Sequence, residues 1–232
     1  MAKEHEQHAD ILSKITGAIE RFIEKYLKII IICISTLVLA LAVYFSVDYV
    51  FAKREQRANV DFGKVYLVYR AYLADRNLSD EQVSEKFNTV IEDFKLVLQN
   101  HPKSKAAAKS AYFIGNILFR LGKYEEAGEF YEKGSAGWGN YYISYLCMQG
   151  SATCQEQLKN YDKAAKIYEE LLAKFKNRFI VPTVLFNLAQ VDEKLNKIDK
   201  AEDGYTKIVD DFKWSSWMEF AQKRILLIKN FM

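Results

Sequence analysis

The feature that most constrains this chain is an apolar run near its N-terminus. From Ile29 to Val47 the sequence reads IIIICISTLVLALAVYFSV and contains no charged side chain. At about 1.5 Å of rise per residue, a helix over this run covers roughly 28 Å, close to the ~30 Å hydrocarbon core of a bilayer. Tyr44 and Tyr49 lie towards its end, where aromatic rings favour the headgroup level. The run therefore predicts one membrane-spanning helix over residues 29–52.

Two kinds of cleavable signal are the alternatives to a permanent anchor. A secretory signal peptide has a shorter apolar stretch and a small-residue cleavage site, whereas here a charged segment over residues 1–28 precedes the run and no A-x-A motif follows. A lipoprotein signal would place small residues before the acylated cysteine, but Ile32 precedes Cys33. We therefore predict that the segment is retained as an anchor.

The segment before the span is predicted to be an amphipathic arm over residues 1–28. Its apolar side chains recur at three- and four-residue steps from Ile11 to Tyr26. Lysine and arginine flank the span on both sides, so the positive-inside rule gives no orientation. The orientation therefore has to come from a family resemblance.

Composition favours one helical domain after the anchor, over residues 53–232. The chain of 232 residues is 50% hydrophobic and contains only two prolines, which suits long helices. Its net charge is +3 with basic and acidic residues interleaved, so nucleic acid is not indicated as a partner. Three cysteines give no disulfide framework, and Cys147 and Cys154 are expected to be core residues.

The domain after the anchor carries an internal repeat, whose clearest copy begins at Ala111 and reads AYFIGNILFRLGKYEEAGEFY. Three copies align a small residue, an alanine twelve positions on and a tyrosine four positions further. Small residues let two antiparallel helices approach closely, and the tyrosine fills the space between neighbouring pairs. The aligned residues are Gly115, Ala127 and Tyr131, then Ala152, Ala164 and Tyr168, then Ala189, Ala201 and Tyr205.

The aligned pattern resembles the tetratricopeptide repeat, whose 34-residue unit is a pair of antiparallel helices. The step here is 37 residues (115, 152, 189), and the extra residues fall between one repeat's tyrosine and the next repeat's first helix. The resemblance implies an all-α fold, an N-terminal transmembrane helix followed by a tetratricopeptide-repeat α-solenoid. Ser79 and Gln82 have the spacing of a capping box that opens a helix. The repeats would cover about 61–103, 108–140, 145–177 and 182–214, with a cap helix over 216–231.

In tetratricopeptide-repeat proteins the first helices line a concave surface that binds protein partners. The basic clamp of the chaperone-binding members is matched here only at Asn116, so recognition of a chaperone tail is disfavoured. Tyr112 and Phe186 are the expected anchors, because aromatic rings supply a large contact area. With Gly115 as position 8, the resemblance gives this partner groove: Lys109, Tyr112, Asn116, Phe119, Arg120, Gln149, Thr153, Glu156, Phe186, Gln190 and Lys194.

The sequence shows no motif for catalysis, a metal or a cofactor. It has no glycine-rich phosphate loop, no H-E-x-x-H, no paired cysteine ligands and no G-x-S-x-G. Acids such as Glu125 and Glu126 are expected on exposed helix faces, and His101 has no evident partner. We expect a non-enzymatic binding protein without a cofactor or a small-molecule substrate.

The order of the parts resembles the YfgM-like family of bacterial inner-membrane proteins. That resemblance implies a cytoplasmic N-terminus and a periplasmic repeat domain, associated with the Sec translocon and handing secreted chains to periplasmic chaperones. Its partners would be translocon, chaperone or envelope-assembly components. Two other functions stay open: a scaffold for envelope assembly or division in the same membrane, and an N-anchored receptor whose repeats face the cytosol.

Overall fold

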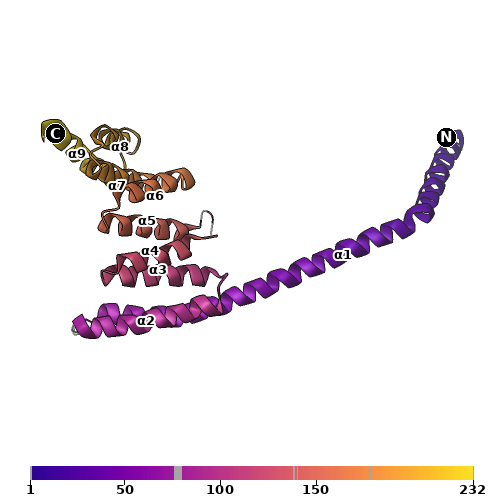
Figure 1. The fold of residues 1–232 in the computed structure, drawn as a ribbon. Helices are drawn as coiled ribbons and strands as arrows, with labels where there is room; N and C mark the ends of the chain where they lie inside the picture. Colours follow the sequence, from indigo (N-terminus) through magenta and orange to yellow (C-terminus); the bar gives the residue numbers. More distant parts are fainter. Residues whose placement is uncertain (1, 76–79, 138, 140, 178, 232) are drawn as a thin grey trace. The chain divides into compact units, whose positions relative to one another are not determined.

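The chain is helical throughout the part that the structure describes. In this computed structural model no strand occurs in the described ranges, which confirms the expectation of an all-α fold. The chain divides into two units, Met1–Lys53 and Arg54–Met232. The described ranges are residues 2–75, 80–137, 139, 141–177 and 179–231 (Figure 1).

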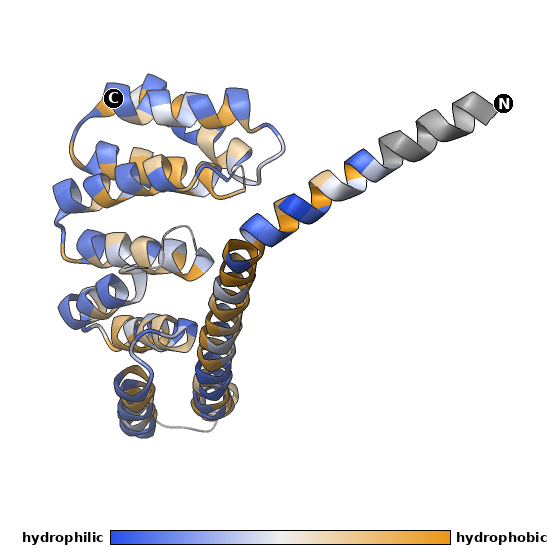
Figure 2. Cartoon of the chain, turned by 90° about the vertical axis from the view of Figure 1, so that its right-hand side faces the viewer, coloured by the Kyte–Doolittle hydropathy of each residue, from blue (hydrophilic) through white to orange (hydrophobic). Residues whose placement is uncertain are grey.

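Unit 1 is the N-terminal part of helix α1 (Ala2–Ala74). Its apolar stretch, orange in Figure 2, is exposed along its length: Leu39 and Phe45, for example, expose 66% and 64% of their surface. The Ser46 hydroxyl donates to the carbonyl oxygen of Ala42, 2.7 Å away, so this polar group is satisfied within the helix. Among the described residues, α1 is the one helix long and apolar enough to cross a membrane.

Helix α1 runs without a break from Ala2 to Ala74, so the described part of the predicted amphipathic arm and the apolar stretch lie on the same helix. Ser79, which was expected to cap the next helix, lies outside the described residues. Unit 2 contains the end of α1 and the following helices: α2 (Asp80–Asn100), α3 (Lys105–Arg120), α4 (Tyr124–Ser135), α5 (Tyr142–Gln157), α6 (Tyr161–Lys174), α7 (Val181–Lys194), α8 (Ile198–Asp211) and α9 (Trp217–Phe231).

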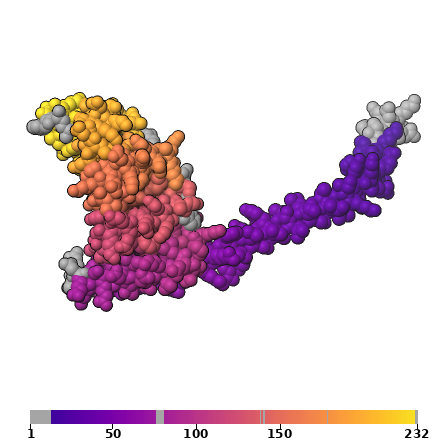
Figure 3. All heavy atoms as spheres, viewed as in Figure 1, coloured from indigo at the N-terminus to yellow at the C-terminus, as the bar shows by residue number. Residues whose placement is uncertain are grey.

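The helices of unit 2 pack as successive antiparallel pairs. Helix α3 pairs with α4, α5 with α6 and α7 with α8, and each pair packs on the next. Figure 3 shows these helices following one another in sequence order, from magenta to yellow. The end of α1 and α2 form the first pair, since the rings of Tyr69 and Phe87 lie 6.1 Å apart and those of Phe62 and Phe94 lie 5.8 Å apart.

Small residues set how closely the helices approach. Ala127, Ala164 and Ala201 are completely buried. A Cβ atom at Gly115 would lie 2.7 Å from the ring of Tyr131, and one at Gly150 would lie 2.5 Å from the same ring. The Tyr131 ring is therefore held between two helices that carry glycine where they face it.

The turn inside each pair repeats with the same geometry. Gly122, Lys159 and Asn196 occupy the same position of successive repeats, and all three adopt a left-handed backbone, with φ of 75°, 59° and 57°. In each turn the next amide donates to a carbonyl five residues back, as Lys123 N does to Leu118 O at 2.9 Å. This is the hydrogen bond of a Schellman helix end, and it turns the chain sharply into the second helix.

Helix α9 covers the end of the last pair. Its Ala221 is completely buried and its Ile228 exposes only 5% of its surface, both against α7 and α8. The Trp217 ring lies 4.6 Å from that of Phe186 on α7. One face of α9 therefore closes the core that α7 and α8 leave open.

Candidate partner-binding surface

The predicted groove residues lie on α3, α5 and α7, the first helices of the three complete pairs. On α3, two of them contact side chains of the first helix pair, which is formed by the end of α1 and α2. Lys109 Nζ lies 3.3 Å from Asn59 Oδ1 and 5.5 Å from the centre of the Phe62 ring. The Arg120 guanidinium lies 5.4 Å from the centre of the Phe87 ring. Both cations therefore have partners within unit 2.

The aromatic residues predicted on α3 are half-buried. Tyr112 packs against Phe113, with ring centres 5.3 Å apart, and Phe119 packs against Tyr124 at 5.1 Å. Each ring shields its neighbour and keeps part of its own surface accessible. Tyr112 can therefore still contribute contact area to a partner.

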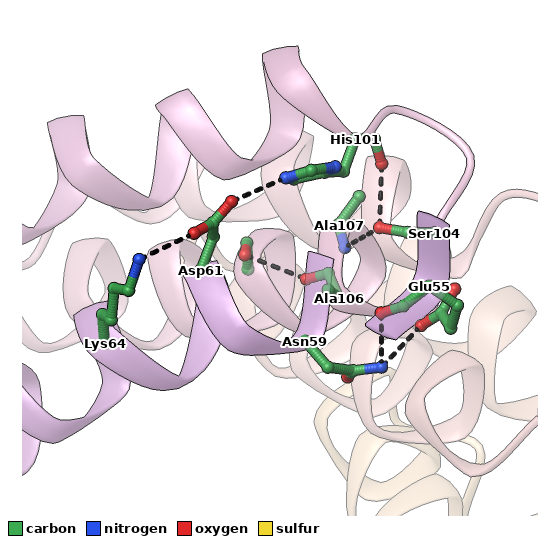
Figure 4. A network of polar contacts seen from close by, with 9 residues as sticks. Glu55, Asn59, Asp61, Lys64, His101, Ser104, Ala106 and Ala107 are labelled. Atoms are coloured by element: carbon green, nitrogen blue, oxygen red, sulfur yellow. Dashed lines mark hydrogen bonds and ion pairs between the residues drawn. The ribbon is translucent and has the colours of Figure 1, made fainter. Parts of the chain in front are cut away.

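A polar network fixes the start of α3 against α1 (Figure 4). The Lys105 amide donates to Glu55 Oε2 at 3.0 Å. Ser104 caps α3, because its Oγ accepts from the Ala107 amide at 3.0 Å. His101 Nε2 lies 3.0 Å from Asp61 Oδ2, and this hydrogen bond is the main cause that lowers the pKa of the Asp61 carboxyl. His101 thus has a partner forty residues back along the chain, which sequence patterns did not reveal.

One hydrogen bond recurs in all three complete pairs. The buried tyrosine of the second helix donates its hydroxyl proton to a side chain of the first helix, and burial raises the pKa of each of these tyrosines, so each remains a protonated donor. In the second and third pairs the acceptor is a glutamate at the same repeat position. The pairs are Tyr131 with Asn116 Oδ1 (2.7 Å), Tyr168 with Glu156 Oε1 (2.6 Å), and Tyr205 with Glu193 Oε1.

The two equivalent glutamates differ in their electrostatic surroundings. Glu193 forms an ion pair with Arg224 of α9, whose Nε donates to Glu193 Oε1 at 3.1 Å. One 37-residue step earlier, Asn187 stands at the position of Arg224. Glu156 forms no ion pair with any described residue, and burial raises the pKa of its carboxyl although the Tyr168 hydrogen bond opposes that shift. Glu156 is therefore a half-buried acid without a cation.

Glu156 opens onto a hollow between α5 and α7 with a volume of about 390 Å³. Three of the predicted groove residues, Glu156, Gln190 and Lys194, meet there. The full lining is Glu156, Gln157, Lys159, Tyr161, Gln190 and Lys194. An acid, two amides and two lysines around one hollow can hydrogen-bond a peptide. Across the ranges that the structure describes, no three His, Cys, Asp or Glu side chains gather as a metal site would require.

The remaining residues of α5 and α7 are less accessible than predicted. Gln149 and Thr153 are half-buried, and the Thr153 hydroxyl donates to the Gln149 carbonyl within α5 at 3.0 Å. Phe186 was expected as an anchor, but it exposes only 6% of its surface. It packs between Trp217 of α9 and Tyr205 of α8, with ring centres at 4.6 Å and 5.3 Å. That prediction was wrong, because α9 covers the face of α7 that the repeat pattern leaves open.

A family model and one solved structure agree with this architecture. Residues 106–177 match the family model described as the tetratricopeptide repeat. A crystal structure of a tetratricopeptide repeat protein from Parabacteroides merdae ATCC 43184 has a TM-score of 0.58 and 17% sequence identity, over 75% of this chain. A structure described as MamA AMB-1 has a TM-score of 0.45 and 16% identity, over 73% of this chain and 93% of that one. No curated protein sequence matches the chain.

Fold and repeats together define the fold class, an all-α solenoid of tetratricopeptide-like helix pairs in which residues 106–177 match the repeat's family model. The matched region covers only 60% of the Parabacteroides protein, and at 17% identity the likeness speaks for the fold alone. Repeats of this class serve as adaptors in protein–protein interaction.

Proposed function

We propose that this chain is a membrane-anchored adaptor that binds protein partners through the surface of α3, α5 and α7. The observation that carries the proposal is the apolar stretch of α1. None of its most apolar window is buried inside the chain, so its side chains need another apolar environment. A bilayer supplies that environment over the length of one helix. Extraction of membranes with alkaline carbonate tests the anchor, since release of the full-length chain would contradict it.

We assign the anchor to the bacterial inner membrane, with a cytoplasmic N-terminus and a periplasmic repeat unit. The order of parts, which resembles that of YfgM-like proteins, supports this location and a role in protein translocation or in transfer of chains to periplasmic chaperones. A reporter enzyme that is active only in the periplasm, fused after Met232, tests the orientation. An inactive fusion, together with an active cytosolic reporter at the same place, would favour a receptor whose repeats face the cytosol.

The hollow around Glu156 is the proposed contact point for a partner. The chain itself shows what fits such an acid, because Arg224 of α9 satisfies the equivalent Glu193. A basic side chain from a partner segment would do the same for Glu156. Gln190 and Lys194 at the rim would then bind backbone carbonyls or acidic groups of that segment. The preferred ligand is accordingly an extended or helical segment with a basic residue flanked by polar ones.

Site-specific photocrosslinking in membranes tests this surface. A photoreactive amino acid at Gln190 is expected to yield crosslinked partners, while one at Lys166, an exposed residue of α6, serves as the matched control. Glu156→Gln should lower the yield at Gln190 because it removes the charge but keeps the size of the side chain. Equal yields at both positions would contradict the proposed surface. Identification of the crosslinked proteins distinguishes a translocation role from an envelope-assembly or division scaffold.

A further inference from the structure

Large aromatic side chains are exposed at the junctions that connect one helix pair to the next. Phe179, between α6 and α7, exposes 79% of its surface. Tyr142, at the start of α5, exposes 59%, and Trp214, between α8 and α9, exposes 50%. These three rings come from three successive junctions of the same kind. Rings of this size in water carry an unfavourable hydration free energy that contact with an apolar phase would relieve.

The exposed rings belong to one contiguous edge of unit 2. The rings of Phe179 and Trp214 lie 5.2 Å apart. Tyr142 lines a hollow of about 260 Å³ together with Lys174, Lys176 and Ile180, which immediately follows Phe179. The Lys105 ammonium lies 5.5 Å from the centre of the Tyr141 ring, which joins the α2–α3 junction to the same row. We call this row the junction edge: Lys105, Tyr141, Tyr142, Lys174, Lys176, Phe179, Lys213 and Trp214.

Lysines lie among the aromatic rings of the junction edge. Lys105, Lys176 and Lys213 are exposed, and Lys174 is half-buried with its Nζ 3.1 Å from Ser144 Oγ. Asp210 and Asp211 close α8 beside Lys213, so the excess of positive charge lies at the α2–α3 and α6–α7 junctions. Tyrosine and tryptophan interleaved with lysine are typical of protein surfaces at the level of lipid headgroups.

The junction edge begins where the chain enters unit 2. Glu55 lies one residue after Arg54, the first residue of that unit, and its carboxylate accepts from the Lys105 amide at 3.0 Å. The apolar stretch of α1 extends to Phe51, and three residues separate it from Glu55 along the chain.

We propose that the junction edge is a membrane-contact surface that binds anionic lipid headgroups. The lysines pair with lipid phosphates, and the rings of Tyr142, Phe179 and Trp214 lie at the boundary between headgroups and acyl chains. The proposal rests on the membrane anchor proposed above and adds a second contact, made by the repeat unit itself. Each lysine near an anionic surface adds to the attraction, which falls off within a Debye length of the headgroups.

The test uses the full chain in lipid nanodiscs, with Cys33→Ser as the starting variant. Cys147 and Cys154 are buried, and burial raises the pKa of each thiol to about 12, so a new exposed cysteine reacts selectively near neutral pH. A polarity-sensitive fluorophore is attached at Phe179→Cys on the junction edge. The matched control carries it at Asp199→Cys, an exposed position at the start of α8, where the turn inside the pair ends.

Nanodiscs that contain phosphatidylglycerol brominated near the headgroup should quench the probe at position 179 roughly twofold relative to unbrominated discs, because the ring position meets the lipid boundary. The control probe at position 199 should be unaffected. Quenching at position 179 should fall in discs of phosphatidylcholine alone, and also after Lys105→Glu with Lys176→Glu. The charge-matched control pair is Lys163→Glu with Lys166→Glu, on the exposed face of α6.

An unquenched probe at position 179 in a chain that co-elutes with anionic discs would overturn the proposed edge and leave the anchor intact. Equal quenching in neutral and anionic discs would also overturn it, since the lysines would then have no role. A chain that does not co-elute with discs would overturn the anchor and the edge together. Quenching that disappears only when a protein partner is added would still support the lipid contact, because it shows lipid at the edge beforehand.

Discussion

The hydroxyl of Tyr168 donates to the Glu156 carboxylate over 2.6 Å, and it connects the second helix of a repeat to the first at a buried position. The same pair recurs as Tyr205 and Glu193 one repeat later. Because the tyrosine is completely buried and the glutamate is half-buried, the bond gives the hydroxyl an acceptor and the carboxylate a donor where water has little access. It holds the acid that faces the proposed groove in one orientation.

Replacement of Tyr168 by phenylalanine is predicted to destabilise unit 2 by about 1–3 kcal/mol, because the half-buried Glu156 loses its hydrogen-bond donor. Tyr142→Phe is the control, since Tyr142 is exposed on the surface. Urea unfolding of the full chain in detergent, followed by circular dichroism, measures both changes. The proposed role of the bond would be refuted by equal midpoints for Tyr168→Phe and the parent chain.

Glu156→Gln is predicted to change how stability depends on pH. Burial raises the pKa of this carboxyl above its ordinary value of about 4.5, so the folded state binds the proton more readily than the unfolded state does. The parent chain should therefore lose stability relative to Glu156→Gln as pH rises from about 4.5 through the raised pKa, and the difference should be constant above it. Unfolding midpoints of the two chains across this range give the measurement. A parent chain that instead gains stability over this range would contradict the assignment.

The contact between the two helices of the second repeat predicts a strong effect of side-chain size. Ala164→Leu should destabilise unit 2 by about 1–3 kcal/mol, because Ala164 has no exposed surface and extra methylenes would overpack the pair. Lys163→Leu adds a similar apolar side chain at the neighbouring exposed position and should change little. Thermal midpoints of both variants test the repeat register, which would be wrong if the two shifts were equal.

Two helical glycines should respond oppositely to alanine. Gly150→Ala should destabilise unit 2 by about 1 kcal/mol or more, because the new Cβ atom would lie 2.5 Å from the Tyr131 ring, where the helices pack closely. Gly128→Ala meets its nearest atom, Cys154 Cβ, only at 4.0 Å, so it should be neutral or stabilising by up to about 1 kcal/mol through helix propensity. Denaturant unfolding of the two variants side by side provides the comparison. Similar destabilisation by both would show that helix packing does not explain the difference.

Local sequence patterns predicted the helix pairs because their contacts are near in sequence. Gly115 and Tyr131 are sixteen residues apart. The repeat pattern predicted that the tyrosine would fill the space between neighbouring pairs, and its ring lies beside Gly115 of its own pair and Gly150 of the next. The left-handed turn at Gly122, which connects the two helices of the first complete pair, falls between Gly115 and Tyr131. Patterns of this kind repeat three times, so each copy supports the others.

Contacts between distant segments were not predictable in the same way. Phe186 was expected on the surface, because the repeat pattern describes α7 and α8 but contains no information about which face α9 covers. The Asp61–His101 and Glu193–Arg224 pairs join residues forty and thirty-one positions apart, and neither belongs to a repeated motif. Such pairs depend on how the terminal helices dock, which is decided by tertiary packing.

The regular 37-residue step has a consequence for the length of this solenoid. Arg224 on α9 stands one step after Asn187 on α7, so the cap helix meets the last pair at the position where a further repeat would begin. A copy of residues 179–215 inserted before α9 would therefore offer the same packing surfaces to the α7–α8 pair before it and to α9 after it. It would add one tyrosine–glutamate pair and two further exposed aromatics at the junction edge, the copies of Phe179 and Trp214. The length of the solenoid could therefore be increased by one whole repeat, while the first helix pair and the cap helix α9 keep their present contacts.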